Sequence, residues 1–491
     1  MVITVDGQKI DVQPGLTVAA TVAALHGSTR QSVSGQARGP LCGMGICYEC
    51  RVTIDGRAHQ RSCQIPVGPG MEISTAVAPE RAGASIGHGR RQSDVLVVGA
   101  GPAGLAAATA VLHAGQRVIV VDDNPEAGGQ IWRYGGPAFS PSIELHCQTR
   151  ILDQPAPGLL RAETPAGTVD FAYTKLLLAT GARERFLPFP GWTLPHVLGA
   201  GGLQAMVKAG LPIAAKRVVV AGTGPLLPLV ASYLRQHGAK IVAIAEQAEA
   251  RVLTKFLSTL PPAKILELMK LAPVLAGVPV WTSTWPAEAH PGGVTLNRWG
   301  RPKTIPCDYL ACGFHLVPNI ELALLLGCLT QNGCVVVNDQ QQTSVPDVYC
   351  AGEPTGVGGV ELAQAEGTIA GLAAAGVPAA SPAYVKPRKR REHYQRFAEH
   401  LDEVCTLRPE LRDLPTNDTI VCRCEDVTWD ALAGEGDRRQ AKLLTRCGMG
   451  ACQGRVCGAA CEFLLGWSAP AVRPPISPAT VAALAAGADG G

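Results

Sequence analysis

The sequence predicts an α/β protein built around two βαβ units, with a small cysteine-rich domain at each end. Two strand–glycine turn–helix–strand patterns occupy residues 94–123 and 217–247, which indicates a doubly wound fold with a second, similar domain inserted. Apolar residues make up 47% of the 491 positions and charged residues 17%, as expected for a chain with large buried cores. The seventeen cysteines gather toward the two ends.

Composition argues against several functions. The net charge of +3 comes without a basic stripe, so we expect no nucleic-acid partner. The one basic run, Lys386 to Arg391, is expected to be a solvated linker face and not a docking patch. The apolar stretch Arg217–Leu234 contains a Gly-Thr-Gly-Pro break and fits a buried strand–turn–helix better than a membrane span.

The start of the chain lacks the basic and apolar regions of a secretory signal, and Met1–Val5 reads as the start of a strand. Cysteines clustered in this way favour metal sites in a reducing compartment over a disulfide framework. We therefore expect a cytoplasmic protein.

The first domain is predicted over residues 1–82. A hairpin turns at Asp6-Gly7, a helix follows over 16–27 with Gly27 as its C-terminal glycine, and residues 50–59 begin a second hairpin. These elements indicate a small α+β sheet crossed by one helix. The glycine- and charge-rich stretch around 83–92 is predicted to be a linker.

Four cysteines of this first domain carry its chemistry. Their spacing, Cys42-x4-Cys47-x2-Cys50-x12-Cys63, matches the plant-type [2Fe–2S] pattern C-x4-C-x2-C…C. Gly43 and Gly45 would let the backbone fold tightly around a cluster. Zinc usually takes C-x2–4-C pairs separated by a longer gap, and a disulfide is disfavoured in a reducing compartment. We predict a [2Fe–2S] cluster, with a gap before Cys63 that is shorter than in plant ferredoxins.

The first βαβ unit has the features of a dinucleotide site. Gly99, Gly101 and Gly104 follow an apolar strand and begin a helix, and Asp122 closes the next strand. The glycines permit a tight turn and close approach of a pyrophosphate, the helix N-terminus stabilises the phosphates, and the carboxylate takes the ribose hydroxyls.

Three further stretches select the ligand: Gly128–Gln130, Leu176–Arg183 and Val348–Glu353. With them the sequence resembles the two-dinucleotide-domain flavoproteins, the pyridine nucleotide–disulfide oxidoreductases and their relatives. The resemblance implies FAD. Glu353 stands where the family's closing motif normally has an aspartate near the ribityl chain. The implied FAD residues are Gly99, Gly101, Pro102, Ala103, Gly104, Asp122, Asp123, Gly129, Gln130, Thr180, Gly181, Gly352 and Glu353.

The second βαβ unit is degraded. Gly222 and Gly224 remain, but Leu227 takes the third glycine position and Pro225 lies in the turn, while Glu246 still ends the second strand. Three interpretations stay open. The unit could be a functional NAD(P) site, a site that holds a different nucleotide or one without a redox role, or a structural remnant. No redox Cys-x-x-Cys or Cys-x4-Cys lies in the predicted flavin domain, so we do not expect a disulfide reductase. The scattered cysteines of the flavin and inserted domains, predicted to be small buried hydrophobes, are Cys147, Cys307, Cys312, Cys328, Cys334 and Cys350.

The second cysteine cluster occupies residues 422–461. Cys422-x-Cys424 suits one end of a rhombic cluster better than two corners of a zinc knuckle. Together with Cys452-x4-Cys457 it resembles the bacterioferritin-associated-ferredoxin-like (BFD-like) domain, a small helical fold that binds [2Fe–2S]. Cys447 and Cys461 leave the ligand set ambiguous. We favour Cys452 and Cys457 beside Cys422 and Cys424, with structural zinc or an empty site as the alternatives.

The expected organisation follows from these resemblances. The fold class is α/β, a glutathione-reductase-like two-dinucleotide-domain flavoprotein with an N-terminal β-grasp ferredoxin-like domain and a C-terminal BFD-like domain. The FAD-binding domain is predicted over 93–211 and 316–378, and the inserted NAD(P)-binding-like domain over 212–315. A linker is expected over 379–415, the BFD-like domain over 416–465 and a tail over 466–491.

The order of these parts resembles the α subunits of bacterial heteromeric flavin dehydrogenases: hydrogen cyanide synthase, D-hydroxyproline dehydrogenase, opine oxidase and dye-linked proline dehydrogenase. The resemblance extends to the Gly-Thr-Gly-Pro-Leu-Leu turn at 222–227 and to residues 473–478. In several relatives the ferredoxin-like module is a separate small subunit, whereas here it is fused.

The resemblance implies an electron-transfer role within a larger enzyme. A partner β subunit of the glycine-oxidase/D-amino-acid-oxidase type would oxidise a C–N bond, and a further small subunit is also expected. Electrons would pass through the clusters and FAD to a quinone or another acceptor. With a membrane quinone as acceptor, this cytoplasmic protein would lie peripherally at the inner face of the membrane. The substrate is not implied.

Two rival hypotheses remain. One is a self-sufficient NAD(P)H:acceptor oxidoreductase that uses the second βαβ unit, and the other is a scaffold subunit without turnover. We assign no catalytic residue, because the eleven histidines are dispersed and no general-base constellation is apparent.

Overall fold

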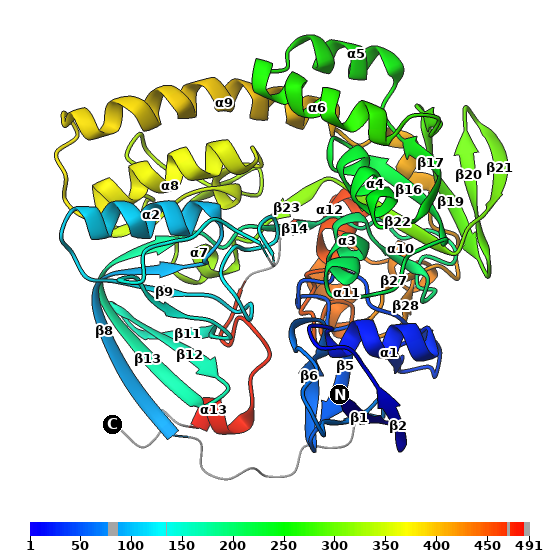
Figure 1. The fold of residues 1–491 in the computed structure, drawn as a ribbon, viewed down its shortest axis with the longest axis horizontal. Helices are drawn as coiled ribbons and strands as arrows, with labels where there is room; N and C mark the ends of the chain where they lie inside the picture. The colour runs from blue at the N-terminus through cyan, green and yellow to red at the C-terminus, as the bar shows by residue number, and fades with distance from the viewer. Residues whose placement is uncertain (77–86, 134, 469–471, 486–491) are drawn as a thin grey trace. The chain divides into compact units, whose positions relative to one another are not determined.

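The computed structural model describes residues 1–76, 87–133, 135–468 and 472–485 and divides into two compact units (Figure 1). Unit 1 consists of Met1–Glu80, Glu184–Leu316 and Asp402–Pro470. Unit 2 consists of Arg81–Arg183, Val317–Leu401 and Ala471–Gly491. Within the described residues, the chain passes between them at β14 (Ala182–Glu184), at β23 (Leu316–Pro318) and near the end of helix α9 (Val385–Val404).

Unit 1 begins with the expected α+β domain. Its sheet has the order β2-β1-β7-β5-β6, with α1 (Val18–His26) capped by the Thr17 hydroxyl and ended by Gly27 at φ 70°. Asp6 and Gly7 both have positive φ, as a tight hairpin turn requires. The strands are β1 (Val2–Val5), β2 (Gln8–Asp11), β5 (Arg51–Ile54), β6 (Arg57–Arg61) and β7 (Glu72–Ser74), with the short pair β3 (Arg30–Gln31) and β4 (Ala37–Arg38) alongside.

The second βαβ unit forms a five-stranded parallel sheet with the order β15-β22-β16-β17-β18. Its strands are β15 (Val197–Gly199), β16 (Arg217–Thr223), β17 (Lys240–Glu246), β18 (Val280–Trp281) and β22 (Tyr309–Phe314), with helices α3 (Ala200–Lys208) and α4 (Leu226–Gln236). The domain boundary that we expected at residue 211 lies near residue 184, because β15 pairs with β22 and takes α3 into this domain.

The rest of unit 1 is an antiparallel sheet, two surface helices and the C-terminal cysteine-rich domain. The sheet is formed by β19 (Thr284–His290), β20 (Gly293–Arg298) and β21 (Arg301–Pro306), and the surface helices are α5 (Ala250–Ser258) and α6 (Pro262–Val274). The cysteine-rich domain has β27 (Ile420–Cys422), β28 (Val427–Thr428), α10 (Asp430–Ala433), α11 (Arg438–Thr445) and α12 (Cys457–Leu465). One hydrophobic core joins it to the inserted domain and to the loop of Cys42 and Cys47.

Unit 2 is the first βαβ domain. Its sheet has the order β10-β9-β8-β13-β12-β11, and β26 also pairs with β13. Gly367 and Gly371 of α8 let this helix pack closely on α2, since a Cβ at either would lie within 2.4 Å of a carbonyl oxygen of α2. The elements are β8 (Gly87–Val98), α2 (Pro102–His113), β9 (Val118–Val121), β10 (Glu144–His146), β11 (Arg150–Ala156), β12 (Leu159–Thr164), β13 (Gly167–Leu178), α7 (Glu321–Leu325), β24 (Thr330–Gln331), β25 (Cys334–Val335), β26 (Val348–Cys350) and α8 (Val360–Ala374).

The linkers and the tail differ in part from expectation. Residues 87–92, assigned to the linker, are strand residues of β8 paired with β13, and residues 83–86 lie outside the described residues. The tail contacts the sheet: the Ile476 N–H donates to the Leu152 carbonyl, and the Thr480 hydroxyl donates to Glu163. It includes α13 (Val481–Ala485), while residues 469–471 and 486–491 are outside the described part.

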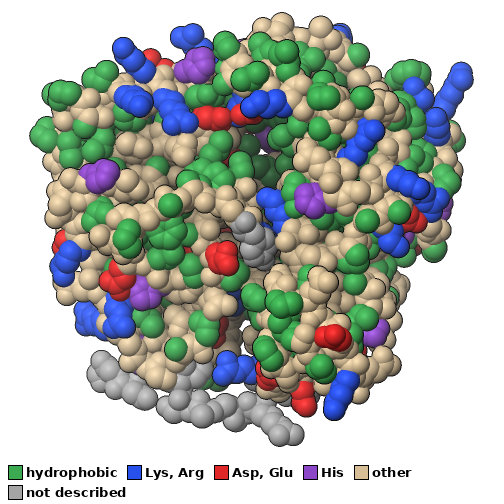
Figure 2. All heavy atoms as spheres, viewed as in Figure 1, with side chains coloured by type: hydrophobic (Ala, Val, Ile, Leu, Met, Phe, Trp, Pro, Cys, Tyr) green, Lys and Arg blue, Asp and Glu red, His purple; other side chains and the backbone are tan. Residues whose placement is uncertain are grey.

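The basic run Lys386–Arg391 lies in α9, and Arg391 pairs with Glu366 and Asp339. On the face drawn in Figure 2, Lys and Arg side chains are spread among other residue types. Among the described helices, none is long and apolar enough to cross a membrane.

Glu184, the last residue of β14, carries a buried carboxylate that contacts the first turn of α3. Its oxygens accept the N–H groups of Gly201 and Gly202 at 2.8 and 3.1 Å, but burial raises its pKa to about 7. A group whose pKa is higher in the folded than in the unfolded protein favours folding below its unfolded pKa, and that stability is lost as pH rises through the folded pKa.

We therefore predict that unit 1 loses stability as pH rises from about 4.5 to about 7, by roughly 3 kcal/mol at this group. Glu184→Gln should remove this dependence. Thermal unfolding of both proteins across that range checks it, with the variant's advantage growing as pH rises. Parallel pH profiles for the two proteins would contradict the assignment.

Candidate functional sites

The first glycine turn forms a narrow cradle at the start of α2. A Cβ at Gly104 would lie 1.8 Å from the Gly99 carbonyl oxygen, and one at Gly99 would lie 2.1 Å from that of Ala179. At Gly101, by contrast, a Cβ would meet only the Gly129 Cα, at 3.9 Å. The helix N-terminus is thus open at Gly101, where an anionic group can approach, while the other glycines are required by the protein's own packing.

The remaining segments expected around a flavin nucleotide meet at this cradle. The Gly128 N–H donates to the Ala100 carbonyl, and a Cβ at Gly352 would lie 2.8 Å from that of Ala103. Pro102 is the first residue of α2. Gln130 accepts a hydrogen bond from Arg133 at 2.7 Å. Unit 2 therefore brings the predicted stretches together from four places in the sequence.

The acid of this site is Asp122, at the end of β9. It accepts the Ala100 N–H at 2.6 Å and the Asn124 N–H at 2.8 Å. Burial, and then the charge of neighbouring Asp123, raise its pKa to about 6. A carboxylate fixed to the glycine turn in this way is placed to accept ribose hydroxyls.

Two residues that the sequence did not predict, Glu366 and Asn319, hold the 352–355 and 180–181 segments of this site in place. Glu366 of α8 is buried and accepts both the Gly352 N–H and the Thr355 hydroxyl at 2.9 Å, whereas the predicted Glu353 accepts the Gly359 N–H at 3.1 Å. Asn319 donates its amide to the Thr180 carbonyl at 3.0 Å, and the Asn319 N–H donates to the Gly181 carbonyl. Neither residue has a local motif, because each acts on a distant segment.

The second glycine turn, in unit 1, is covered by the chain itself. A Cβ at Gly224 would lie 2.7 Å from the Cys405 sulfur, and Glu246 accepts the Gly224 N–H and the Thr223 hydroxyl at 2.8 Å. Gln247 donates to the Thr406 carbonyl. Leu227 is buried in the packed start of α4. The segment after α9 thus fills the space above this turn.

The four N-terminal cysteines lie together and are buried, each no more than 2% exposed. The Cys42 and Cys47 sulfurs are 3.1 Å apart, and the Cys63 thiol forms a hydrogen bond with the Cys50 sulfur. N–H groups of Met44 and Glu49 donate to sulfur at 3.4 Å. Four sulfurs with backbone N–H donors in a dry loop are the donor set that a [2Fe–2S] cluster needs.

Glycines shape this loop. Gly43 and Gly45 have φ 61° and 80°, and a Cβ there would lie 2.7 Å from the Cβ of Ala205 and 2.5 Å from the Gln64 side chain. The loop therefore packs directly on α3 and on the segment that carries Cys63. Only glycine satisfies both the backbone conformation and the close approach.

The six C-terminal cysteines form two groups. The Cys422, Cys447 and Cys457 sulfurs lie within 4.8 Å of one another, and hydrogen bonds from Cys447 and Cys457 lower the pKa of the Cys422 thiol to about 3. The Cys424 thiol forms a hydrogen bond with the Cys452 sulfur. A Cβ at Gly450 would lie 2.2 Å from that of Cys424. The predicted ligands are thus divided between the two groups, Cys422 and Cys457 beside Cys447 and Cys424 beside Cys452, with Cys461 next to Cys447.

The scattered cysteines of the central domains have no such grouping. Cys307, Cys312, Cys328 and Cys350 are buried as predicted, while Cys147 and Cys334 are partly exposed. No disulfide occurs among the described cysteines.

The fold and these sites define a flavoprotein oxidoreductase with an iron–sulfur domain. Residues 93–367 match the pyridine nucleotide-disulphide oxidoreductase family, and residues 1–78 match the 2Fe-2S iron-sulfur cluster binding domain. The chain belongs to this oxidoreductase family, which implies FAD, and the N-terminal match implies a [2Fe–2S] cluster.

Relatives extend the assignment beyond these two matches. The opine oxidase A chain from Agrobacterium tumefaciens is 31% identical over 74% of this chain and 84% of its own. Hydrogen cyanide synthase subunit HcnB from Pseudomonas aeruginosa is 30% identical over 78% of this chain and 96% of its own. The HcnA subunit of that synthase is 43% identical over 77 residues, which are 15% of this chain and 73% of HcnA.

A solved structure shares the fold. The L-proline dehydrogenase from P. horikoshii aligns with a TM-score of 0.74 over 98% of this chain and 97% of that chain, at 18% identity. The sequence relatives show that this chain is homologous to subunits of multi-subunit oxidoreductases, and the expected family resemblance is confirmed.

The cradle yields a first test of flavin binding. Gly101→Trp should leave unit 2 folded, because a Cβ there meets only one atom within 4 Å, yet it should lower flavin content at least about tenfold by filling the pyrophosphate position. Flavin absorbance per folded protein measures this. Gly434→Trp, at an exposed glycine with nothing within 4 Å, is the control. Full flavin occupancy in Gly101→Trp would refute the site.

Proposed function

We propose that this chain is the electron-transfer subunit of a heteromeric dehydrogenase that oxidises a C–N bond of an amine, amino acid or opine. The observation that carries the proposal is the presence of a nucleotide cradle and two buried cysteine clusters on one chain that is similar, over most of its length, to the opine oxidase A chain. Our proposed ligands are Cys42, Cys47, Cys50 and Cys63 for one cluster, and Cys422, Cys424, Cys452 and Cys457 for the other.

The division of labour follows from the cofactors' chemistry. A bound flavin accepts two electrons and an iron–sulfur cluster carries one, so a chain that holds both can divide a hydride equivalent into single-electron steps. The residues of this chain bind, orient and desolvate those groups. Asp122 and the helix N-terminus at Gly101 would hold the nucleotide, and buried loops would keep water from the sulfurs.

The substrate-oxidising centre is proposed to lie in a partner. We propose a flavoprotein of the glycine-oxidase/D-amino-acid-oxidase type as that partner, with a quinone as one acceptor. The match of HcnA to 77 residues supports a fused counterpart of a separate small subunit, so a further small subunit is not required here. Seventeen free cysteines support a cytoplasmic location, because thiols persist in reducing compartments.

The test of this proposal is a tagged purification from the native cells. Co-purifying chains are identified, and dye reduction is measured with glycine, proline, hydroxyproline and opines as donors. Turnover is expected only when a flavoprotein partner is present, and Gly101→Trp should abolish it with assembly intact. Turnover by the isolated chain would refute partner dependence, and full turnover in the assembled variant would favour the scaffold reading.

The covered second turn generates a prediction about nicotinamide nucleotides. We propose that this βαβ unit is structural, because Cys405 occupies the approach to Gly224. NADH or NADPH in large excess should leave the flavin of the isolated chain oxidised for minutes, while dithionite bleaches it. Stopped-flow absorbance measures this. Bleaching within seconds would instead support the self-sufficient NAD(P)H oxidoreductase.

The ligand assignment makes a second prediction. Cys452→Ala should remove about half of the iron, the content of one two-iron cluster, whereas Cys447→Ala should retain it. Iron and acid-labile sulfide per chain are the measurement, with circular dichroism as the folding control. Loss of half the iron in Cys447→Ala alone would move Cys447 into the ligand set in place of Cys452.

A further inference from the structure

The two cysteine loops of unit 1 are joined through the residues between their cysteines. Glu49 lies between Cys47 and Cys50, and Arg423 lies between Cys422 and Cys424. The Glu49 side chain is 0% exposed and that of Arg423 1%. Arg423 Nε lies 3.5 Å from Glu49 Oε1. A carboxylate from one loop and a guanidinium from the other thus meet in the protein interior.

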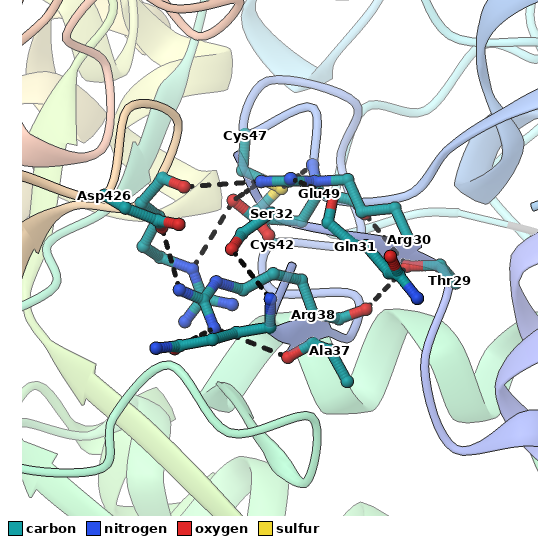
Figure 3. Close-up of polar contacts among 12 residues, drawn as sticks. Thr29, Arg30, Gln31, Ser32, Ala37, Arg38, Cys42, Cys47, Glu49 and Asp426 are labelled. Atoms are coloured by element: carbon teal, nitrogen blue, oxygen red, sulfur yellow. Dashed lines mark hydrogen bonds and ion pairs between the residues drawn. The ribbon is translucent and has the colours of Figure 1, made fainter. Parts of the chain in front are cut away.

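Arg30 is the third residue at this contact between Glu49 and Arg423. Its Nη2 donates to Glu49 Oε1 at 3.1 Å (Figure 3). The same Nη2 donates to the Arg423 carbonyl at 3.4 Å. The Glu49 N–H donates to the Cys47 sulfur at 3.4 Å, and Arg423 directly precedes Cys424 in the sequence. Arg30 therefore binds one residue of each cysteine loop.

A second buried pair lies alongside. Arg38 Nη2 donates to Asp426 Oδ1 at 2.8 Å (Figure 3). The N–H and hydroxyl of Ser34 donate to Asp426 Oδ2 at 3.1 and 2.6 Å. Asp426 follows Cys424 by two residues, so this pair also ties the N-terminal domain to the C-terminal loop. Its side chains are 2% and 6% exposed.

The network carries more positive than negative charge. Arg30, Arg38 and Arg423 face Glu49 and Asp426, an excess of one positive charge. Arg423 Nη2 and Arg38 Nε are buried without an acceptor among the described residues. An uncompensated buried cation is costly, unless an anion lies beside it. A thiolate-ligated iron–sulfur cluster is such an anion, and each reduction adds negative charge to it.

We propose that this network, Arg30, Arg38, Glu49, Arg423 and Asp426, is the contact through which the two iron–sulfur sites exchange electrons. It fixes the loops against each other, and its excess positive charge stabilises the reduced form of either site. In the exchange one electron leaves one site and enters the other, with no bond made or broken and no proton moved. The inference rests on the proposed function for the presence of the C-terminal cluster.

The experiment uses the full chain and pairs of variants with opposite charge effects. Arg423→Gln removes a positive charge and Glu49→Gln a negative one. Arg38→Gln and Asp426→Asn likewise remove one positive and one negative charge. Neither residue lies between two cluster cysteines in the sequence, so this pair serves if the first variants fail to assemble their clusters. Arg57→Gln, at an exposed position of the same domain, is the control. Readouts are iron content, EPR-monitored reduction potentials and the spin–spin interaction of the fully reduced protein.

We expect the reduced wild-type protein to show magnetic interaction between two centres. The arginine variants should make reduction at least tenfold less favourable, about 59 mV for one electron, and the acid variants should shift it the opposite way. A role limited to folding would not give opposite signs. About four irons per chain, with no interaction and with potentials equal to those of Arg57→Gln, would overturn this inference alone. About two irons would overturn it together with the C-terminal cluster.

Discussion

The Glu49 carboxylate is fully buried between two cysteine loops, and the packing of unit 1 depends on pairing it. A buried charge without partners would cost several kcal/mol, so Arg30 and Arg423 must approach from separate parts of the chain. Arg423 is in turn held by the Trp192 carbonyl and ring. The ferredoxin-like domain, the inserted domain and the C-terminal domain therefore share one interior, and this explains why residues so far apart in sequence form one unit.

The burial of these two cysteine loops also makes them suitable sites for redox chemistry. Buried cysteine loops exclude water, and in such surroundings the charge near a cluster strongly affects its reduction potential. The flavin cradle in unit 2 is built differently, from backbone groups and from glycines that cannot carry a Cβ. Each unit thus supplies the kind of site that its proposed cofactor requires.

Local patterns predicted much of this protein. Three short-range signals predicted local structure correctly. The glycine turn is followed by helix α2, helix α1 ends at Gly27, and the C-x4-C-x2-C cysteines lie buried in one loop. What the sequence could not predict depends on distant contacts. Glu366, Asn319, Arg30 and Arg38 have no motif, the pairing of β15 with β22 moved a domain boundary, and Cys405 covers a turn that is distant in sequence.

We propose that this chain holds two [2Fe–2S] clusters, one in each cysteine-rich domain. Mössbauer spectroscopy of the full chain, grown with ⁵⁷Fe and combined with total iron, tests it most directly. We predict about four irons per chain, all in spin-coupled diferric pairs when the protein is oxidised, with half becoming ferrous on full reduction. Two irons per chain, or iron in isolated tetrahedral sites, would contradict it.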